Sequence, residues 1–263
     1  MKDEGFRKLS DMFSLKGRTA LVTGSARGIG RGIALALAEF GCRVAVHGSK
    51  PSGHLDEALA LVREMSPESF PVSANLADRK AVAGLVGELR ARDAMPDILV
   101  ANASVQYRAK WNEITPVQAD EQMQVNFHST LQLVQGFAPR MLEAKWGRIV
   151  TVGSVQERRP HPDMAVYAAS KGAQENLVRN LAKQFGPTGV TVNNLCPGVF
   201  LTDRNREALA DPVYGKAVTD VIPLHRYAMP HDAAGAALLL CSDAGRYITG
   251  TTILVDGGLS LPK

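Results

Sequence analysis

The sequence contains little of what secreted, metal-binding or membrane-spanning proteins usually carry. Cys42, Cys196 and Cys241 are its only cysteines, and they lie far apart in apolar surroundings, so we expect reduced thiols in a cytoplasmic protein. The six histidines form no spacing typical of a metal site, and no metal is expected. Residues 1–16 lack the apolar core of a signal peptide, and no later run could cross a bilayer. We therefore expect no membrane partner.

The chain also has only a small excess of positive over negative residues, and it has few aromatic side chains. The net charge is +4, but lysine and arginine are scattered among acids without a long basic run, so a nucleic-acid partner is not expected. Aromatic residues make up 6% of the chain, whereas hydrophobic residues make up 45%, which is enough for a sizeable core. A chain of 263 residues dominated by Gly, Ala, Val and Leu is typical of a parallel sheet covered by helices.

Short apolar runs alternate along the chain with longer amphipathic segments. The apolar runs predict strands at residues 19–24, 42–48, 69–76, 97–103, 147–154, 190–198 and 251–258. The amphipathic segments predict helices at residues 28–41, 54–65, 78–92, 115–145, 165–186 and 230–245. Pro139 is expected to interrupt or bend the helix at 115–145. The short connections predict an α/β fold, a doubly wound, Rossmann-type parallel sheet of seven strands with helices on both faces.

One long stretch does not fit this alternation. Residues 200–229 are polar and punctuated by proline, which is unusual for a connection inside a compact domain. Such a segment can close over a substrate, so we expect a lid here. Because no linker or internal repeat interrupts the chain, we expect a single domain over residues 1–263, with residues 1–14 as an N-terminal extension.

The first predicted strand ends in the glycine-rich sequence TGSARGIG, residues 23–30, which opens the first predicted helix. At such a junction, free backbone N–H groups and the positive end of the helix dipole can bind a pyrophosphate. Gly24, Gly28 and Gly30 permit a tight turn and a close approach of the phosphate oxygens. Their spacing departs from the general G-x-G-x-x-G fingerprint, but the strand–turn–helix context favours a dinucleotide site over simple helix packing.

A tyrosine and a lysine lie one helical turn apart in the predicted helix at 165–186. Tyr167 and Lys171 occupy positions i and i+4, so their side chains can point into the same space. The spacing alone is equally consistent with a surface tyrosine beside a solvated lysine. A nearby cation favours the phenolate and brings a tyrosine, whose pKa is ordinarily about 10, closer to neutral pH. The pair can therefore form a general acid/base.

These motifs in this order resemble the compact, single-domain branch of the short-chain dehydrogenase/reductase family over nearly the whole chain. The matching positions are residues 23–30, Asn126, Ser154, Tyr167, Lys171 and residues 196–198. The resemblance implies that Tyr167 is the general acid/base and that Ser154 holds the substrate oxygen. It implies that Lys171 supports Tyr167 and binds the cofactor ribose, and that Asn126 holds a water that relays protons to Lys171.

The second predicted strand ends in HGSK, residues 47–50, and carries no carboxylate there. In dinucleotide sites an acid at this place binds the adenosine ribose, whereas a basic or small residue admits a 2′-phosphate. Ser49, Lys50 and Arg27 can all serve such a phosphate, so NADP(H) is the expected cofactor. The cofactor-binding residues that the resemblance implies are Gly24, Ser25, Arg27, Gly28, Ile29, Gly30, Ser49, Lys50, Asn75, Leu76, Asn102, Ala103, Tyr167, Lys171, Pro197, Gly198, Val199 and Thr202.

Three positions depart from the family pattern. The usual Asn-Asn-Ala-Gly sequence is replaced by ANAS, residues 101–104, and Asn75 stands where relatives usually carry an aspartate. Asn102 can still support the loop, and Asn75 can still accept a hydrogen bond from the adenine. These changes affect the expected cofactor affinity more than the chemistry.

The segment between Ser154 and Tyr167 is expected along the substrate cleft, with Gln156, Glu157 and Arg158 as substrate contacts. Its sequence resembles bacterial glucose dehydrogenases, whose substrate is a sugar, and amides and carboxylates suit polyhydroxylated ligands. The general layout resembles 3-oxoacyl-(acyl-carrier-protein) reductases, a very common branch, which we place first.

The resemblance implies a small carbonyl or alcohol substrate, carried on acyl carrier protein in the first alternative. A catalytically inactive NADPH sensor is an alternative of another class, although the complete catalytic set disfavours it. Relatives of this branch are mostly tetramers, and the predicted long helices carry apolar positions beyond those that one sheet face needs, so we expect a homotetramer.

Overall fold

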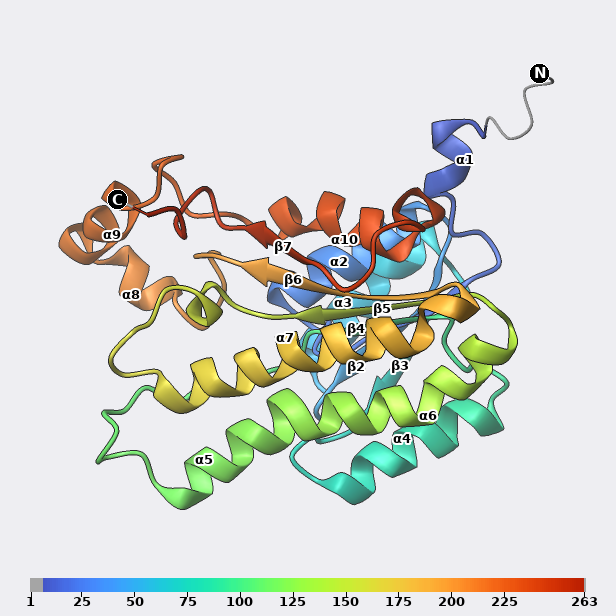
Figure 1. Cartoon of the computed structure of the whole chain (residues 1–263), viewed down its shortest axis with the longest axis horizontal. Coiled ribbons are helices and arrows are strands. Elements are labelled where there is room, and N and C mark those ends of the chain that lie inside the picture. The colour runs from blue at the N-terminus through green and yellow to red at the C-terminus, as the bar shows by residue number, and fades with distance from the viewer. Residues whose placement is uncertain (1–6, 263) are drawn as a thin grey trace.

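A parallel sheet of seven strands forms the centre of the computed structural model, which describes residues 7–262 (Figure 1). The strand order is β3-β2-β1-β4-β5-β6-β7, and every neighbouring pair is parallel. The strands are β1 Thr19–Val22, β2 Arg43–Gly48, β3 Phe70–Ser73, β4 Ile98–Ala101, β5 Gly147–Val152, β6 Val190–Pro197 and β7 Thr252–Val255. The predicted doubly wound sheet is confirmed. Its strand order reverses between β1 and β4, which opens a crevice at their carboxyl ends.

Helices cover both faces of the sheet, because successive strand residues point to opposite sides. In β1, Ala20 and Val22 belong to one buried cluster and Leu21 to the other. The helices of the first cluster are α2 Gly28–Glu39, α3 Gly53–Met65 and α10 Ala234–Cys241. Those of the second are α4 Arg79–Ala91, α6 Ser129–Glu143 and α7 Ala165–Phe185. The sheet and its two helical layers hold the strand ends in fixed positions.

The predicted helix at 115–145 differs from the expectation in where it becomes irregular. It consists of α5 Pro116–Met123, a π-helical turn η1 Gln124–His128, and α6. Pro139 lies inside α6 without interrupting it. Ala138 and Met141 are buried on either side of the proline, so packing against the sheet outweighs the missing hydrogen bond. The π-helical turn instead falls around Asn126, and such turns are frequent at functional sites.

Two segments are more ordered than the sequence suggests. Residues 200–229 contain the helices α8 Arg206–Ala210 and α9 Pro212–Asp220, and the bridge between Phe200 and Ala228 joins the two ends of the segment. The described part of the N-terminal extension, residues 7–14, contains α1 Leu9–Phe13, and residues 1–6 lie outside the described residues.

The last predicted helix is shorter than expected. The segment 230–245 consists of α10 flanked by the 3-10 turns η4 Pro230–Ala233 and η5 Asp243–Gly245. Another 3-10 turn, η3 Gly186–Thr188, ends α7. Between residues 7 and 262, no helix has the length and apolar character needed to span a bilayer.

Candidate active site

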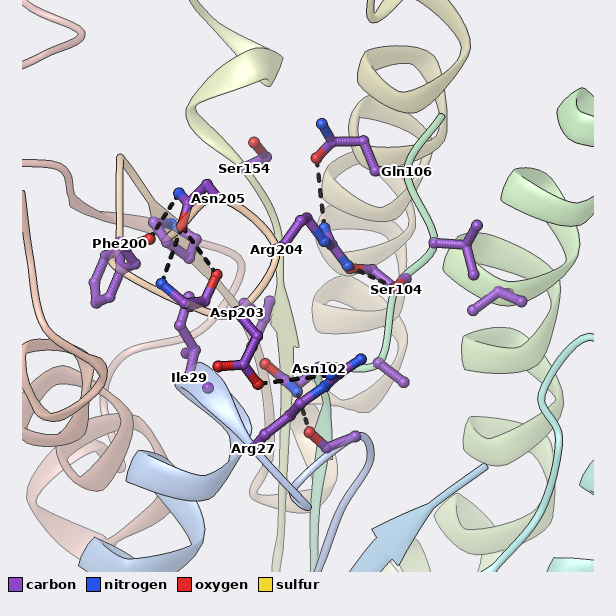
Figure 2. Close-up of a pocket in the computed structure, with 18 of the residues that line it drawn as sticks. Arg27, Ile29, Asn102, Ser104, Gln106, Ser154, Phe200, Asp203, Arg204 and Asn205 are labelled. Carbon is purple, nitrogen blue, oxygen red and sulfur yellow. Dashed lines mark hydrogen bonds and ion pairs between the residues drawn. The ribbon is translucent and has the colours of Figure 1, made fainter. Parts of the chain in front are cut away.

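A cavity of about 970 Å³ follows the carboxyl ends of the central strands and continues beneath the segment 200–229. The predicted site residues that line it are Gly24, Arg27, Gly28, Ile29, Ser49, Lys50, Asn75, Leu76, Asn102, Ala103, Ser154, Gln156, Tyr167, Lys171, Pro197, Gly198, Val199 and Thr202. Five predicted site residues do not line it, namely Ser25, Gly30, Asn126, Glu157 and Arg158. Figure 2 shows how part of this wall is arranged.

The glycine loop is shaped by close backbone contacts. Gly24 and Gly28 have positive φ angles of 65° and 58°, which favour glycine. A Cβ atom on Gly30 would lie 2.6 Å from the carbonyl oxygen of Gly24 and would also collide with the Asn102 side chain. Asn102 donates hydrogen bonds to the carbonyl oxygens of Thr23 (2.8 Å) and Gly24 (3.3 Å). The loop therefore has the shape that lets a pyrophosphate approach its backbone.

Ser25 and Gly30 do not line the cavity, so their contact with the cofactor stays a prediction. The Ser25 hydroxyl donates to the carbonyl of Val22 (2.7 Å) and accepts from the backbone N–H of His47 (2.9 Å). The Ser25 N–H donates to the carbonyl of His47. Because its polar groups are used internally, Ser25 is a support for the loop.

His47, which no sequence motif singles out, ties the glycine loop to β2. Its Nδ1 accepts a hydrogen bond from the Gly24 N–H (3.0 Å), and its Nε2 lies 3.1 Å from the carbonyl of Ala74. These partners assign the proton to Nε2. Burial lowers the pKa of His47 to about 4, so the ring is neutral at physiological pH. Its place at the end of the second predicted strand, two residues before Ser49, was the available sequence signal.

Ser154 and Tyr167 meet at the other end of the cavity. Ser154 follows β5, and its hydroxyl accepts a hydrogen bond from the Gln156 N–H (3.2 Å) at the start of the 3-10 turn η2 Val155–Glu157. Tyr167 lies on the first turn of α7 and is 6% exposed. Burial raises the pKa of Tyr167, whereas the Arg204 charge and a hydrogen bond with Ser154 oppose that rise. The two hydroxyl groups are placed to share one substrate oxygen.

Lys171 is buried behind Tyr167, with its Nζ 5.9 Å from the centre of the tyrosine ring. The ammonium donates to the carbonyl of Val152 (2.7 Å) and to Oε1 of Gln174 (2.9 Å). Burial lowers the pKa of Lys171 to about 7, and the Glu157 carboxylate opposes this shift. The Arg204 charge also acts on the Tyr167 hydroxyl and opposes the rise of its pKa, and the support of Tyr167 by Lys171 stays a prediction.

Asn126 lies in the π-helical turn and is fully buried. Its Oδ1 accepts from the Val105 N–H (2.9 Å), and its Nδ2 donates to the carbonyl of Val105 (2.9 Å) and to the Ser170 hydroxyl (2.9 Å). The side chain therefore joins the segment after β4 to α7 next to Lys171. It does not reach the cavity, so the water relay implied by the family resemblance stays a prediction.

Glu157 and Arg158 do not line the cavity, so their contact with the substrate stays a prediction. The Glu157 carboxylate accepts from the Ser154 N–H (2.9 Å) and from Nδ2 of Asn194 (3.0 Å). Arg158 forms an ion pair with Glu175 (2.9 Å) at the surface. The cause is the 3-10 turn η2, which rotates successive side chains to different sides and leaves Gln156 facing the cavity.

Arg204, which no sequence motif singles out either, reaches into the cavity from the segment 200–229 (Figure 2). Its guanidinium donates to the carbonyl (2.8 Å) and the hydroxyl (3.2 Å) of Ser104 and lies 3.4 Å from Oε1 of Gln106. The only sequence signal was an arginine two residues after Thr202, at the start of a segment of unassigned structure. The neighbouring Asp203 pairs with Arg27 of the glycine loop (3.5 Å).

Comparison with known proteins agrees with this arrangement. Residues 24–260 match a family model described as "Enoyl-(Acyl carrier protein) reductase". The chain is 33% identical to gluconate 5-dehydrogenase of Gluconobacter oxydans, over 95% of this chain and 98% of the relative. It is 34% identical to the 3-oxoacyl-[acyl-carrier-protein] reductase FabG of Staphylococcus aureus, over 92% and 98%. The chain belongs to the short-chain dehydrogenase/reductase family.

Solved structures of this family superpose closely on the chain. A 3-oxoacyl-(acyl-carrier-protein) reductase from Agrobacterium tumefaciens with NADP bound has a TM-score of 0.91 and 37% identity, covering 98% of this chain and 99% of that chain. A gluconate 5-dehydrogenase from Burkholderia cenocepacia in complex with NADP and tartrate has a TM-score of 0.89 and 32% identity, covering 97% and 100%. NADP in these relatives agrees with the cofactor predicted from the sequence.

As a short-chain dehydrogenase/reductase, the protein is an oxidoreductase, and its own residues fit the chemistry of that family. NADP(H) would lie with its pyrophosphate on the glycine loop and its 2′-phosphate at Ser49, Lys50 and Arg27. The Tyr167 hydroxyl can exchange a proton with a substrate oxygen, while the Ser154 hydroxyl orients that oxygen. Among the described residues, no group of three or more potential metal-binding side chains occurs.

Proposed function

We propose that the protein uses NADP(H) to interconvert a ketone and a secondary alcohol by hydride transfer. The observation that carries this proposal is the meeting of Ser154 and Tyr167, backed by Lys171, in the cavity that also contains the glycine loop. When bound, the cofactor supplies or accepts the hydride. Tyr167 transfers the proton, Ser154 holds the reacting oxygen, and Lys171 stabilises the charge behind Tyr167. The absence of a carboxylate at the end of β2 supports NADP(H) over NAD(H).

Two substrate classes deserve testing. Reduction of 3-oxoacyl groups on acyl carrier protein is the first, and the name of the S. aureus relative supports it. Oxidation of a sugar or polyol is the second, and Gln156 favours it. Gln156 lines the cavity, and its Oε1 is buried without a hydrogen-bond partner among the described residues. A hydroxyl group of the substrate would satisfy this acceptor.

Absorbance assays with NADPH and NADH test the proposal. An acetoacetyl thioester, free and on acyl carrier protein, would be reduced in one direction, and aldoses, polyols and sugar acids would be oxidised in the other. Turnover that depends on NADP(H) and disappears in Tyr167→Phe would support the proposed function. Tight NADPH binding without turnover of any substrate would instead favour the sensor alternative.

We further infer a homotetramer and a cytoplasmic location. Strand β7 is the edge of the sheet, and Leu254 on it is 41% exposed, which supports pairing with a second copy. The three cysteines are free and buried, which supports a reducing compartment. Light scattering coupled to gel filtration tests the assembly, and a mass equal to that of one chain would contradict it.

A further inference from the structure

Arg204 is held in place by its own segment of the chain. Its neighbour Asn205 accepts a hydrogen bond from the Thr202 N–H (3.0 Å) and donates one to the carbonyl of Phe200 (2.8 Å). Phe200 is itself buried in the core. Figure 2 shows this turn beside the cavity, with Arg204 extending from it toward Ser104 and Gln106. The Arg204 side chain is exposed, but its guanidinium is held by its hydrogen bonds to Ser104 and Gln106.

The charge of Arg204 has no counter-ion in the structure. Its partners, the Ser104 carbonyl and hydroxyl and the Gln106 amide oxygen, are all neutral. Within residues 7–262, no carboxylate lies within ion-pair distance of its guanidinium. The nearest acid in sequence, Asp203, is paired with Arg27.

A second arginine increases the positive charge of this wall. Arg108 lines the cavity and lies on the same connection as Ser104 and Gln106. Glu121 also lines the cavity, and its carboxylate accepts the Tyr107 hydroxyl, but the two arginines exceed this one acid. The part of the wall near Ser104 and Gln106 thus has an excess of positive charge close to the reacting hydroxyls.

We propose that Arg204 binds a carboxylate of the substrate, so that the enzyme acts on hydroxy acids in preference to neutral polyols and thioesters. This inference rests on the proposed function, because it assumes that the substrate lies at Ser154 and Tyr167. A planar guanidinium can bind a carboxylate through two parallel hydrogen bonds, and the weak contact with Gln106 leaves donors free for it. A neutral polyol offers no such partner, and an acyl thioester would place apolar groups against an unpaired charge.

The substrate would be held at two points. Its carboxylate would lie against Arg204, and the hydroxyl to be oxidised would lie between Ser154 and Tyr167. The buried Oε1 of Gln156 would accept a further hydroxyl. Because Arg204 belongs to the segment 200–229, binding the carboxylate would also tie this segment to the reaction centre.

Binding of D-gluconate and of D-glucitol to the NADPH complex would test this inference. Both probes have six carbons and similar hydroxyl groups, but only the first carries a carboxylate. We expect the wild-type complex to bind gluconate at least about tenfold more tightly, as judged by calorimetry or cofactor fluorescence. In Arg204→Gln, gluconate binding should weaken roughly 10- to 100-fold, because a charge-assisted bidentate pair is lost.

The matched control is Arg206→Gln, a change in an exposed arginine on α8 that does not line the cavity. It should leave gluconate and NADPH binding unchanged, and Arg204→Gln should leave NADPH binding within about twofold. Equal affinity for the two probes, or unchanged gluconate binding in Arg204→Gln, would overturn the inference while the proposed function stands. Failure of the wild type to bind NADPH would contradict the proposed function itself and the inference with it.

Discussion

The Glu157 carboxylate accepts the backbone N–H of Ser154 at 2.9 Å and so places a partly buried acid directly behind the residue that orients the substrate oxygen. Burial raises the pKa of Glu157 to about 7, with the nearby Glu175 adding to the rise and Lys171 opposing it. Glu157 in turn opposes the lowering of the Lys171 pKa. The two groups are therefore electrostatically coupled behind the reaction centre.

Glu157→Gln should change how stability depends on pH. Between about pH 4.5 and 7, native Glu157 keeps its proton while the unfolded chain has released it, so the native state binds more protons. The free energy of unfolding of the wild type should therefore fall with rising pH across this window, by on the order of 2–3 kcal/mol. The variant should lack this fall, and urea denaturation at several pH values measures it.

Exposed Glu207 on α8 provides the control for this experiment. Glu207→Gln should reproduce the wild-type pH dependence, because the carboxylate is in solvent. Lys171 does not contribute to this slope below pH 7. Its pKa is about 7 in the native state and ordinarily 10.5, so it changes the free energy of unfolding only between these two pH values. Identical slopes in the wild type and Glu157→Gln below pH 7 would contradict the assigned environment of Glu157.

Tyr167→Phe should remove catalysis without removing cofactor binding. Loss of the proton donor is expected to lower kcat by about 10²- to 10⁴-fold, while the Kd for NADPH stays within about twofold. Steady-state rates and fluorescence titration measure the two quantities separately. The control is Tyr247→Phe, because Tyr247 is completely exposed and should not affect either. Turnover that survives in Tyr167→Phe would show that another group transfers the proton.

Ser49→Asp should reverse the choice of cofactor. The new carboxylate would lie at the end of β2, where it would repel a 2′-phosphate and accept hydrogen bonds from the ribose hydroxyls of NADH. We expect the Kd for NADPH to rise at least about tenfold, and the Kd for NADH to rise much less or to fall. Titration with both cofactors measures this, with the exposed Ser10→Asp as a control for added charge. Equal weakening of both cofactors would place the 2′-phosphate elsewhere.

Gly30→Ala should disturb the glycine loop. A Cβ atom would lie 2.6 Å from the Gly24 carbonyl and would force Asn102 out of its position. We expect a loss of about 1–3 kcal/mol in stability and weaker NADPH binding. Thermal unfolding and cofactor titration measure the two effects.

Gly84→Ala on α4 is a matched control, since nothing lies within 4 Å of its added Cβ atom. This change should stabilise the protein by about 0.5–1 kcal/mol, because alanine favours a helix interior. A Gly30→Ala variant as stable as Gly84→Ala, with unchanged cofactor affinity, would contradict the described packing of the loop.

Several features of the protein were determined by the sequence alone. Apolar runs and amphipathic segments have different periods, so their alternation predicted all seven strands and the doubly wound sheet. The glycine loop was also predictable, because its turn needs positive φ angles at Gly24 and Gly28, which favour glycine. Tyr167 and Lys171 were predictable as a pair, because helical spacing brings them to one side of α7.

Only the tertiary structure decided where the remaining polar side chains act. Glu157 and Gln156 are adjacent in sequence, yet the 3-10 turn sends one behind Ser154 and the other into the cavity. Arg204 contacts Ser104, which lies 100 residues earlier in the chain, and no local pattern encodes that contact. Periodicity determines which face of an element is buried, but the direction of a single side chain in a turn depends on contacts made by distant segments.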